Sequence, residues 1–559
     1  MRELFRRLMG RPLLSLELVG ASLFANLLAL AAPIYVIQVL NRYVANGVDS
    51  TLMTLSMGAI IAVFIEFSFR QVRHSLAKGI SIKPDEQIAK ISFGALTRIK
   101  SGALDKMPPG QQRQVLQGVD HIRNAYSASN ISTILDLPFA VLFLAVLYLL
   151  SPELGVIASI FIIISFIIGL ILTTAIRTPS RALSDAALRA NIITSTAIQE
   201  SDTVRVFNAA DALTQSWQSK FKLAQTLFRK IINRQGLLAS LSNSIVGLLS
   251  ISTIGVGAIL VVQGKLDVGA LIGANILAAR ALQPITKFSQ MGETFLKANQ
   301  SLSRLNEFLK LPREAETGSA KRDYSGSLEL RDLSFMYPET TGPLFESLSV
   351  IIPAGSICVI SGKNGSGKTT LSRMIVGLIE PDRGQILADG LDLRQVHPEW
   401  WRKQIIYLPQ EPGFINGTFQ DNLTINNTNI DLAQLNEILN MTGLKEFLDE
   451  TPDGLLTNVI DNGRKLAVGI RRRLALARGL VTGGKLMVLD EPTEGMDKEG
   501  SQVISMILTN LHKQGHTVIM TSHDPKIINQ ANIYINLNSK PIPKITASNK
   551  ILEGKTNEK

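Results

Sequence analysis

The segment SICVISGKNGSGKTTLSRMIVGL, residues 356–378, decides the fold of the carboxyl-terminal half of this chain. Its centre, residues 362–369, has the pattern G-x-x-x-x-G-K-T of a phosphate-binding loop. An apolar, strand-like run (356–361) precedes the loop and a helix-like run (370–378) follows it, which is the order that such a loop requires. Glycines allow backbone amides to surround a phosphate at the start of a helix. The segment therefore predicts an α/β domain that binds a nucleoside triphosphate.

The loop supplies most of the candidate nucleotide ligands. We expect Lys368 to reach the β- and γ-phosphates and the hydroxyl of Thr369 to ligate Mg²⁺. The full set of loop residues expected to contact the nucleotide is Gly362, Lys363, Asn364, Gly365, Ser366, Gly367, Lys368, Thr369 and Thr370.

Two later segments end in polar side chains that suit phosphate chemistry. Residues 485–492 read KLMVLDEP, a buried strand that ends in Asp490, which can hold Mg²⁺ through water. Glu491 follows and can orient or deprotonate the attacking water. Residues 518–523 read VIMTSH, a second buried strand, and His523 at its end is a candidate contact of the γ-phosphate. The order of these segments after a phosphate loop makes hydrolysis of the nucleotide the expected reaction.

The amino-terminal half is built differently. Residues 13–290 hold long apolar runs, whereas residues 310–559 have the composition of a soluble α/β protein. A membrane span needs about 20 apolar residues. Six segments qualify, the third of them starting near Ile131: 13–39, 51–69, 135–150, 154–173, 238–262 and 268–285. We expect a six-span membrane domain over 1–310, a polar linker over 311–327, an ATPase domain over 328–540 and a disordered polar tail over 541–559.

The distribution of charge predicts the topology. Lys and Arg are frequent in the two long connections, 70–130 and 174–237, and at the amino terminus, whereas the short connections carry only Arg42 and Lys265. By the positive-inside rule, we expect both termini and both long loops to be cytoplasmic. Both long loops lack long apolar runs and show helix-like patterning, so we expect helices to continue out of the membrane through them. This topology accounts for the net charge of +11. Because no basic-aromatic recognition motif accompanies the charge, we expect the lipid bilayer and not nucleic acid as the partner.

Arg280 is the charged residue placed deepest within a span. It lies about 18 Å along a span that begins at residue 268, where a charge is costly and usually faces a cavity or a partner. Two interpretations remain open: Arg280 faces a hydrated pathway, or it extends toward the inner surface. The single cysteine, Cys358, lies in the strand before the phosphate loop and is expected to pack as a small apolar group.

Taken together, these motifs resemble the nucleotide-binding domain of ATP-binding cassette (ABC) transporters. Six spans with two long inner loops in front of that domain resemble the half-transporter form of the exporters, over residues 10–540. The resemblance implies ATP hydrolysis with Mg²⁺, coupled to transport. It also implies further roles at matching positions: Tyr337 stacks on adenine, Gln410 senses Mg²⁺ and the membrane domain, and His523 is the switch histidine. Asp497 matches the aspartate after the second strand motif and is a candidate nucleotide contact.

One motif departs from the family pattern. The family carries L-S-G-G-Q, which completes the ATP site of the opposite subunit, whereas residues 466–470 read LAVGI. Gly469 fits, but Ala467 replaces the serine and Val468 the first glycine. Losing a hydrogen bond to a charged group costs about 1.5–3 kcal/mol. Backbone amides at the helix start can still bind phosphate, so Ala467 and Gly469 stay among the candidate nucleotide contacts.

Within the exporters, three segments resemble type I secretion ATPases of Gram-negative-type bacteria: 28–52, 197–213 and 269–285. That resemblance implies an inner-membrane dimer, with the homodimer favoured, that joins a periplasmic adaptor and an outer-membrane channel to export unfolded proteins with a carboxyl-terminal signal. The short segment before the first span predicts that no amino-terminal peptidase domain is present. Two alternatives stay open: a lipid or drug exporter, and a poorly hydrolysing regulatory subunit of a heterodimer.

Overall fold

The computed structural model describes residues 2–44, 47, 49–320, 323–337, 340, 342–496 and 498–547. The chain divides into two compact units. The first comprises residues 1–98 and 107–311, and the second comprises residues 99–106 and everything from residue 312 onward. The second unit therefore includes a short piece of the first long loop.

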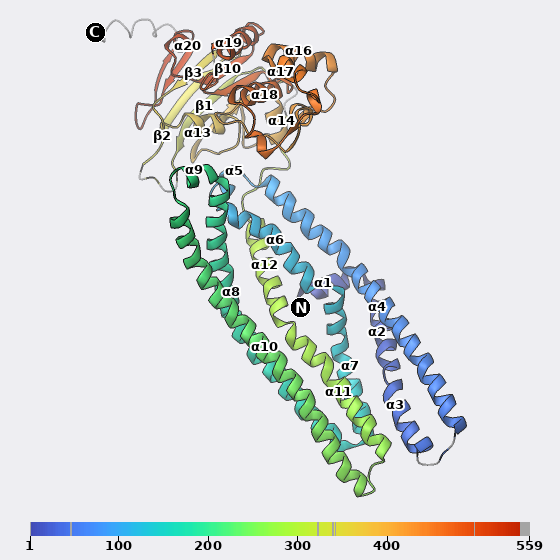
Figure 1. The fold of residues 1–559 in the computed structure, drawn as a ribbon. Helices are drawn as coiled ribbons and strands as arrows, with labels where there is room; N and C mark the ends of the chain where they lie inside the picture. The colour runs from blue at the N-terminus through green and yellow to red at the C-terminus, as the bar shows by residue number, and fades with distance from the viewer. Residues whose placement is uncertain are drawn as a thin grey trace. The chain divides into compact units, whose positions relative to one another are not determined.

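The first unit is helical, and the prediction of six spans is confirmed. Among the residues that the structure describes, six helical segments are long and apolar enough to cross a membrane: Pro12–Val44, Asp49–Arg98, Ala128–Leu150, Pro152–Gln199, Ala210–Val262 and Val268–Leu309. The helices of this unit (Figure 1) are α1 (Arg2–Met9), α2 (Pro12–Leu28), α3 (Ala31–Gln38), the π-helix η1 (Val39–Val44), α4 (Asp49–Arg98), α6 (Pro109–Ala125), α7 (Ala128–Leu150), α8 (Pro152–Gln199), α9 (Ser201–Val206), α10 (Ala210–Val262), α11 (Val268–Gln290) and α12 (Gly292–Leu309).

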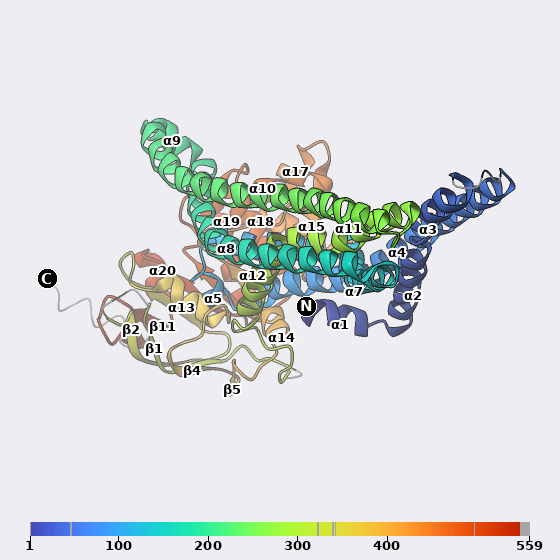
Figure 2. The same cartoon turned by 90° about the horizontal axis from the view of Figure 1, so that it is seen from below.

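Three of these helices are far longer than a membrane is thick. Helices α4, α8 and α10 have 50, 48 and 53 residues, whereas about 20 residues span a bilayer. They therefore continue into both long loops, as the sequence predicts. Helices α8 and α10 lie side by side (Figures 1 and 2).

Close helix packing and a buried polar cluster hold the first unit together. A Cβ atom added at Gly273 of α11 would overlap the side chain of Ile37 in α3. These two helices can therefore pack this closely only because residue 273 is a glycine. Elsewhere, Arg73 of α4 donates to Asp136 of α7 at 2.6 Å, and Asn26 of α2 donates to the same carboxylate at 2.9 Å. Three helices are thus joined through a single carboxylate.

Arg280 is half-buried on α11 and forms no ion pair within the described part of the chain. We predict that a cysteine in its place reacts with a small charged thiol reagent, because an unpaired charge in a span is stable when it faces water. Ala278→Cys is the matched control, since Ala278 is fully buried on the same helix and its thiol should stay protected. Complete protection of Arg280→Cys with and without ATP would contradict a hydrated pathway.

Cys358 does not disturb that experiment. Its side chain is fully buried in β3, and burial raises the pKa of the thiol to about 12. Because the thiolate is the reactive form, Cys358 of the parent protein should not react with the reagent.

The second unit is an α/β structure with three sheets. An antiparallel sheet has the order β2-β1-β4-β5, a larger sheet has the order β12-β11-β3-β10-β9-β6, and β7 pairs with β8. The strands are β1 (Leu328–Phe335), β2 (Phe345–Ile352), β3 (Ile357–Ser361), β4 (Arg383–Ala388), β5 (Leu391–Asp392), β6 (Ile405–Leu408), β7 (Gly417–Thr418), β8 (Asn458–Val459), β9 (Leu486–Asp490), β10 (Thr517–Thr521), β11 (Ile533–Asn536) and β12 (Lys544–Ala547).

The helices of the second unit surround these sheets. They are α5 (Ser101–Leu104), α13 (Lys368–Ile375), α14 (Pro398–Lys403), α15 (Phe419–Thr424), α16 (Leu432–Thr442), α17 (Leu444–Asp449), α18 (Val468–Leu480), α19 (Lys498–Lys513) and α20 (Pro525–Asn529), with short 3₁₀ turns at Gly454–Leu456 and Asp461–Gly463. Every residue of β9 and β10 is buried. The apolar runs of the sequence are therefore the central strands of the large sheet.

The sheet extends past residue 540, where we expect the ATPase domain to end. Strand β12 pairs antiparallel with β11, with Ile545 opposite Ile535. The expectation of disorder from residue 541 is thus wrong for residues 544–547. A four-residue, largely exposed edge strand leaves little periodicity to detect. Residues 548–559 lie outside the described part of the chain.

Candidate functional site

Four neighbouring parallel strands bring the predicted site residues together. In the order β3-β10-β9-β6 their carboxyl ends lie at the same edge of the sheet. The phosphate loop follows β3, His523 follows β10, Glu491 follows β9 and Gln410 follows β6. Ligands of open α/β sheets bind at this edge, so the topology explains why residues up to 160 positions apart converge.

The phosphate loop is held in one tight conformation. Gly365 and Gly367 have φ of 78° and 108°, which is backbone that L-residues rarely adopt. A Cβ atom at Gly367 would also lie 2.6 Å from the side chain of Leu344. The backbone N–H of Lys363 donates to Asn538 at 2.7 Å. Helix α13 begins directly after Gly367, so the amides at its start are available to a phosphate.

Lys368 lies at the centre of the site. It is buried, and its Nζ donates to the carbonyl of Gly362 at 2.7 Å. The same nitrogen lies 2.8 Å from Nε2 of His523 and 3.1 Å from Oε1 of Glu491. The ammonium group of Lys368 therefore lies beside His523, the candidate contact of the γ-phosphate, and beside Glu491, the candidate base for the attacking water.

The backbone at Glu491 is strained. This residue has φ of +48°, which costs a non-glycine residue about 1–3 kcal/mol and persists only where neighbours enforce it. Its N–H donates to Oγ1 of Thr521 at 2.7 Å, and its carbonyl accepts from Nη1 of Arg472 at 2.5 Å. Both sides of the strained residue are thus fixed by side chains.

The side chain of Glu491 is largely buried and remains an ionised carboxylate. Burial by itself would raise its pKa, but the hydrogen bond and the positive charge of the Lys368 ammonium outweigh burial and hold the pKa below its ordinary value. A base must be ionised to accept a proton, so Glu491 is chemically suited to that role at neutral pH.

Asp490, Thr369 and Gln410 carry the oxygens that we expect to hold a nucleotide-bound Mg²⁺. Asp490 is fully buried; its Oδ1 accepts from Thr521 at 2.7 Å, while Oδ2 has no hydrogen-bond partner in the structure. Oγ1 of Thr369 donates to Oε1 of Gln410 at 3.4 Å. A buried oxygen without a partner is costly unless a ligand satisfies it. Mg²⁺ typically takes one or two protein oxygens plus phosphates and waters.

Tyr337, the residue expected to stack on adenine, contacts Thr370 of the phosphate loop. The hydroxyl of Tyr337 lies 2.9 Å from Oγ1 of Thr370, and its ring meets that of Phe335 edge to face at 5.0 Å. The ring stays partly exposed, as a residue that stacks on a base must be. The predicted contact Asp497 lies outside the described residues.

The degenerate signature is separate from the phosphate loop of its own chain. Helix α18 begins at Val468, with Ala467 at its N-cap and no side-chain cap. No hydrogen bond or ion pair in the described part of the chain joins residues 466–470 to residues 362–370. Ala467 and Gly469 are thus not gathered with the other predicted nucleotide contacts.

Three residues of the site were not predicted from the sequence. Thr521 links Asp490 to Glu491, Arg472 holds the carbonyl of Glu491, and Glu494 accepts from Nε2 of Gln410 at 3.4 Å. Thr521 lies within the VIMTSH segment. A hydroxyl at the end of a buried strand was the feature of the sequence that could have identified it as a site residue. Arg472 is one of three consecutive arginines, and nothing in that run distinguishes it.

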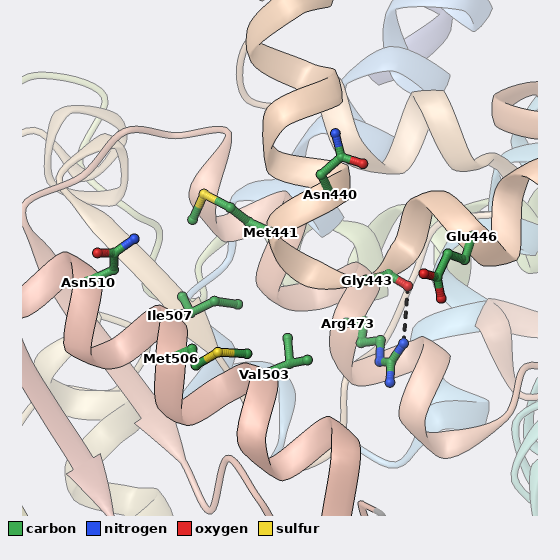
Figure 3. Close-up of a pocket in the computed structure, with 9 residues that line it drawn as sticks. All are labelled: Asn440, Met441, Gly443, Glu446, Arg473, Val503, Met506, Ile507 and Asn510. Atoms are coloured by element: carbon green, nitrogen blue, oxygen red, sulfur yellow. Dashed lines mark hydrogen bonds between the residues drawn. The ribbon is translucent and has the colours of Figure 1, made fainter.

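A separate pocket lies among α16, α17, α18 and α19 (Figure 3). It is lined by Asn440, Met441, Gly443, Glu446, Arg473, Val503, Met506, Ile507 and Asn510. None of these is a predicted site residue, so this pocket does not belong to the phosphate site.

Both halves of the chain match families of known proteins. Residues 16–285 match the ABC transporter transmembrane region, and residues 345–494 match the ABC transporter ATPase domain. The alpha-hemolysin translocation ATP-binding protein HlyB of Escherichia coli O157:H7 is 26% identical over 92% of this chain and 73% of its own length. The leukotoxin export ATP-binding protein LtxB of Aggregatibacter actinomycetemcomitans is 26% identical over 91% of this chain and 72% of its own length.

A solved structure supports the same architecture. A bacterial Atm1-family ABC exporter with ATP bound superposes with a TM-score of 0.82 over 99% of this chain and 96% of its own, at 21% identity. At that identity the likeness shows the fold. The two family matches, the exporter fold and the ATPase site together show that this chain belongs to the ABC transporters, as a fused membrane and ATPase chain that couples ATP hydrolysis to transport.

Proposed function

We propose that this chain is the ABC component of a type I secretion system, which exports an unfolded protein with a carboxyl-terminal signal. The observation that carries the proposal is the set of relatives that match more than nine-tenths of the chain and are named for translocation or export of protein toxins. The proposal includes an inner-membrane location with both termini cytoplasmic, and partnership with a periplasmic adaptor and an outer-membrane channel.

In the proposed mechanism the site residues act as follows. The loop residues 362–370 cradle the phosphates, with Lys368 on the β- and γ-phosphates. Thr369, Gln410 and Asp490 hold Mg²⁺, which neutralises phosphate charge when bound. Glu491 takes the proton from the attacking water, and His523, which lies 3.7 Å from that carboxylate, contacts the γ-phosphate. The converging distances around Lys368 support these assignments.

We further propose that the working unit is a homodimer in which the start of α18 completes the site of the second copy. The exposed side chain of Val468 and the absence of a capping group at Ala467 support this. The same departure from the family motif favours a second candidate, in which this chain pairs with a different transporter chain that carries the full motif.

The double substitution Ala467→Ser with Val468→Gly separates these possibilities. If the signature limits a homodimer, the purified single chain should hydrolyse ATP several-fold faster, because a serine hydroxyl restores a hydrogen bond to the γ-phosphate. The measurement is steady-state phosphate release by the detergent-solubilised chain. Since serine at an N-cap also stabilises a helix by about 0.5–2 kcal/mol, the thermal stability of each variant is measured alongside.

No gain in turnover, with ATP-dependent dimerisation confirmed, would show that residues 466–470 do not limit the enzyme. A chain that neither dimerises nor hydrolyses ATP until a second transporter chain is added would contradict the homodimer.

The partners can be tested in the source cells. After crosslinking during export, capture of this chain should recover a periplasmic adaptor and an outer-membrane channel, identified by mass spectrometry. Recovery of neither partner, from cells in which the chain is active as an ATPase, would favour a lipid or drug exporter.

A further inference from the structure

The signature helix also reaches into the hydrolytic site of its own chain. Arg472 lies one turn into α18 and is 5% exposed. Its Nη1 donates to the carbonyl of Glu491 at 2.5 Å, and its Nη2 donates to the carbonyl of Gln410 at 3.4 Å. One planar guanidinium group therefore contacts the backbone after β9 and the backbone after β6, which are the two segments that carry the base and the expected magnesium sensor.

Glu494 contacts both Arg472 and Gln410. Its carboxylate lies 4.0 Å from Nη2 of Arg472 and accepts from Nε2 of Gln410 at 3.4 Å. The same Nε2 also donates to Glu491 at 3.2 Å. The amide of Gln410 is thus held between two carboxylates, and the backbone beneath it is held by Arg472.

The strained backbone conformation of Glu491 depends on these contacts. A residue with φ of +48° relaxes unless its neighbours enforce that conformation. Thr521 fixes the N–H side and Arg472 fixes the carbonyl side. Without Arg472, the carbonyl of Glu491 keeps only the hydrogen bond from the backbone N–H of Glu494, at 3.2 Å. This weaker hold should let the catalytic carboxylate turn away while the phosphate loop stays intact.

We propose that Arg472, together with Glu494, is a positioning element for hydrolysis that ties the signature helix to Glu491 and Gln410 of the same chain. Movement of α18 against the sheet then changes the position of the base in its own subunit. This inference rests on the proposed roles of Glu491 and Gln410, and it gives the signature helix a function that does not depend on the residues 466–470.

The test compares turnover with nucleotide affinity. Arg472→Met keeps the length of the side chain and removes its donors, so kcat should fall about ten- to hundredfold, the loss expected when hydrogen bonds from a charged group disappear. Affinity for a non-hydrolysable ATP analogue, measured by calorimetry with Mg²⁺ present, should change less than about twofold. Arg472→Lys keeps the charge but has its donors on a single nitrogen and lacks the planar group whose two nitrogens reach the two carbonyls, so it should restore little of the turnover.

Arg473→Gln is the matched control. Arg473 is the next residue of α18 but donates to the carbonyl of Gly443 at 3.1 Å, in the separate pocket (Figure 3). This variant should keep the turnover of the parent protein.

Glu494 keeps the proposal testable even if Arg472 variants fold poorly, because its side chain is 58% exposed. Glu494→Ala should lower kcat about three- to tenfold without weakening analogue binding, and combined with Arg472→Met it should add little further loss. Parent turnover in Glu494→Ala, or fully additive losses in the double variant, would overturn the inference. Full activity of Glu491→Gln would instead overturn the assignment of the base itself.

Discussion

Glu491→Gln is expected to bind ATP as the parent protein does and to lose at least about 99% of its turnover, because general-base catalysis contributes about 10²–10⁴-fold. The amide is the same size as the carboxylate and can still meet Nε2 of Gln410 through its oxygen. It cannot accept the proton of the attacking water. The phosphate cradle, which holds most of the nucleotide contacts, does not include this side chain.

The measurements are phosphate release and calorimetric binding of ATP to the same preparations. Glu411→Gln is the control, since Glu411 is an exposed carboxylate beside Gln410 in the sequence, and its loss should leave turnover unchanged. Equal turnover in Glu491→Gln and the parent protein would reject Glu491 as the base.

Lys368→Ala is expected to weaken the binding of ATP itself, by at least about tenfold, and to abolish turnover with it. Charge-assisted hydrogen bonds to phosphate are the strong ones, and each is worth about 1.5–3 kcal/mol. Lys368 is buried and its Nζ already lies within 3.1 Å of Glu491, so its loss also leaves that carboxylate without its cation.

Lys363→Ala is the control for charge in the same loop. Its side chain is exposed, and the loop contact to Asn538 uses its backbone N–H. It should bind ATP within about threefold of the parent protein, since exposed charges contribute little. If Lys368→Ala keeps parent affinity, Lys368 does not bind the phosphates. Thermal unfolding without nucleotide checks that the variant is folded.

The sequence predicted the large features because each leaves a local pattern. Six apolar runs mark six helices, and glycines at fixed spacing mark the phosphate loop. The strands that end at Asp490 and Thr521 are buried throughout, so their apolar runs were visible, and parallel pairing then forces their ends together. Continuation of α4, α8 and α10 beyond the membrane was predicted from the helix-like patterning of the two long loops.

The features that were missed depend on contacts between distant residues. Arg472 acts through backbone carbonyls, which have no sequence signature, and its two arginine neighbours look the same. The strain at Glu491 cannot be predicted from a Glu in a sequence, because it is imposed by Thr521 and Arg472. Strand β12 owes its structure to pairing with β11 and not to its own four residues.

The central claim is that this chain drives the export of a protein, and the exported proteins of the source cells test it most directly. Cells that carry the parent chain are compared with cells that carry Lys368→Ala at equal abundance in the membrane, and the culture medium of each is analysed by quantitative mass spectrometry. The account predicts that one or a few proteins without an amino-terminal signal peptide disappear from the medium of the variant and remain inside the cells, and that removing the carboxyl-terminal segment of such a protein blocks its export from parent cells. An unchanged set of secreted proteins, with ATP hydrolysis by the purified parent chain confirmed, would contradict protein export as the function.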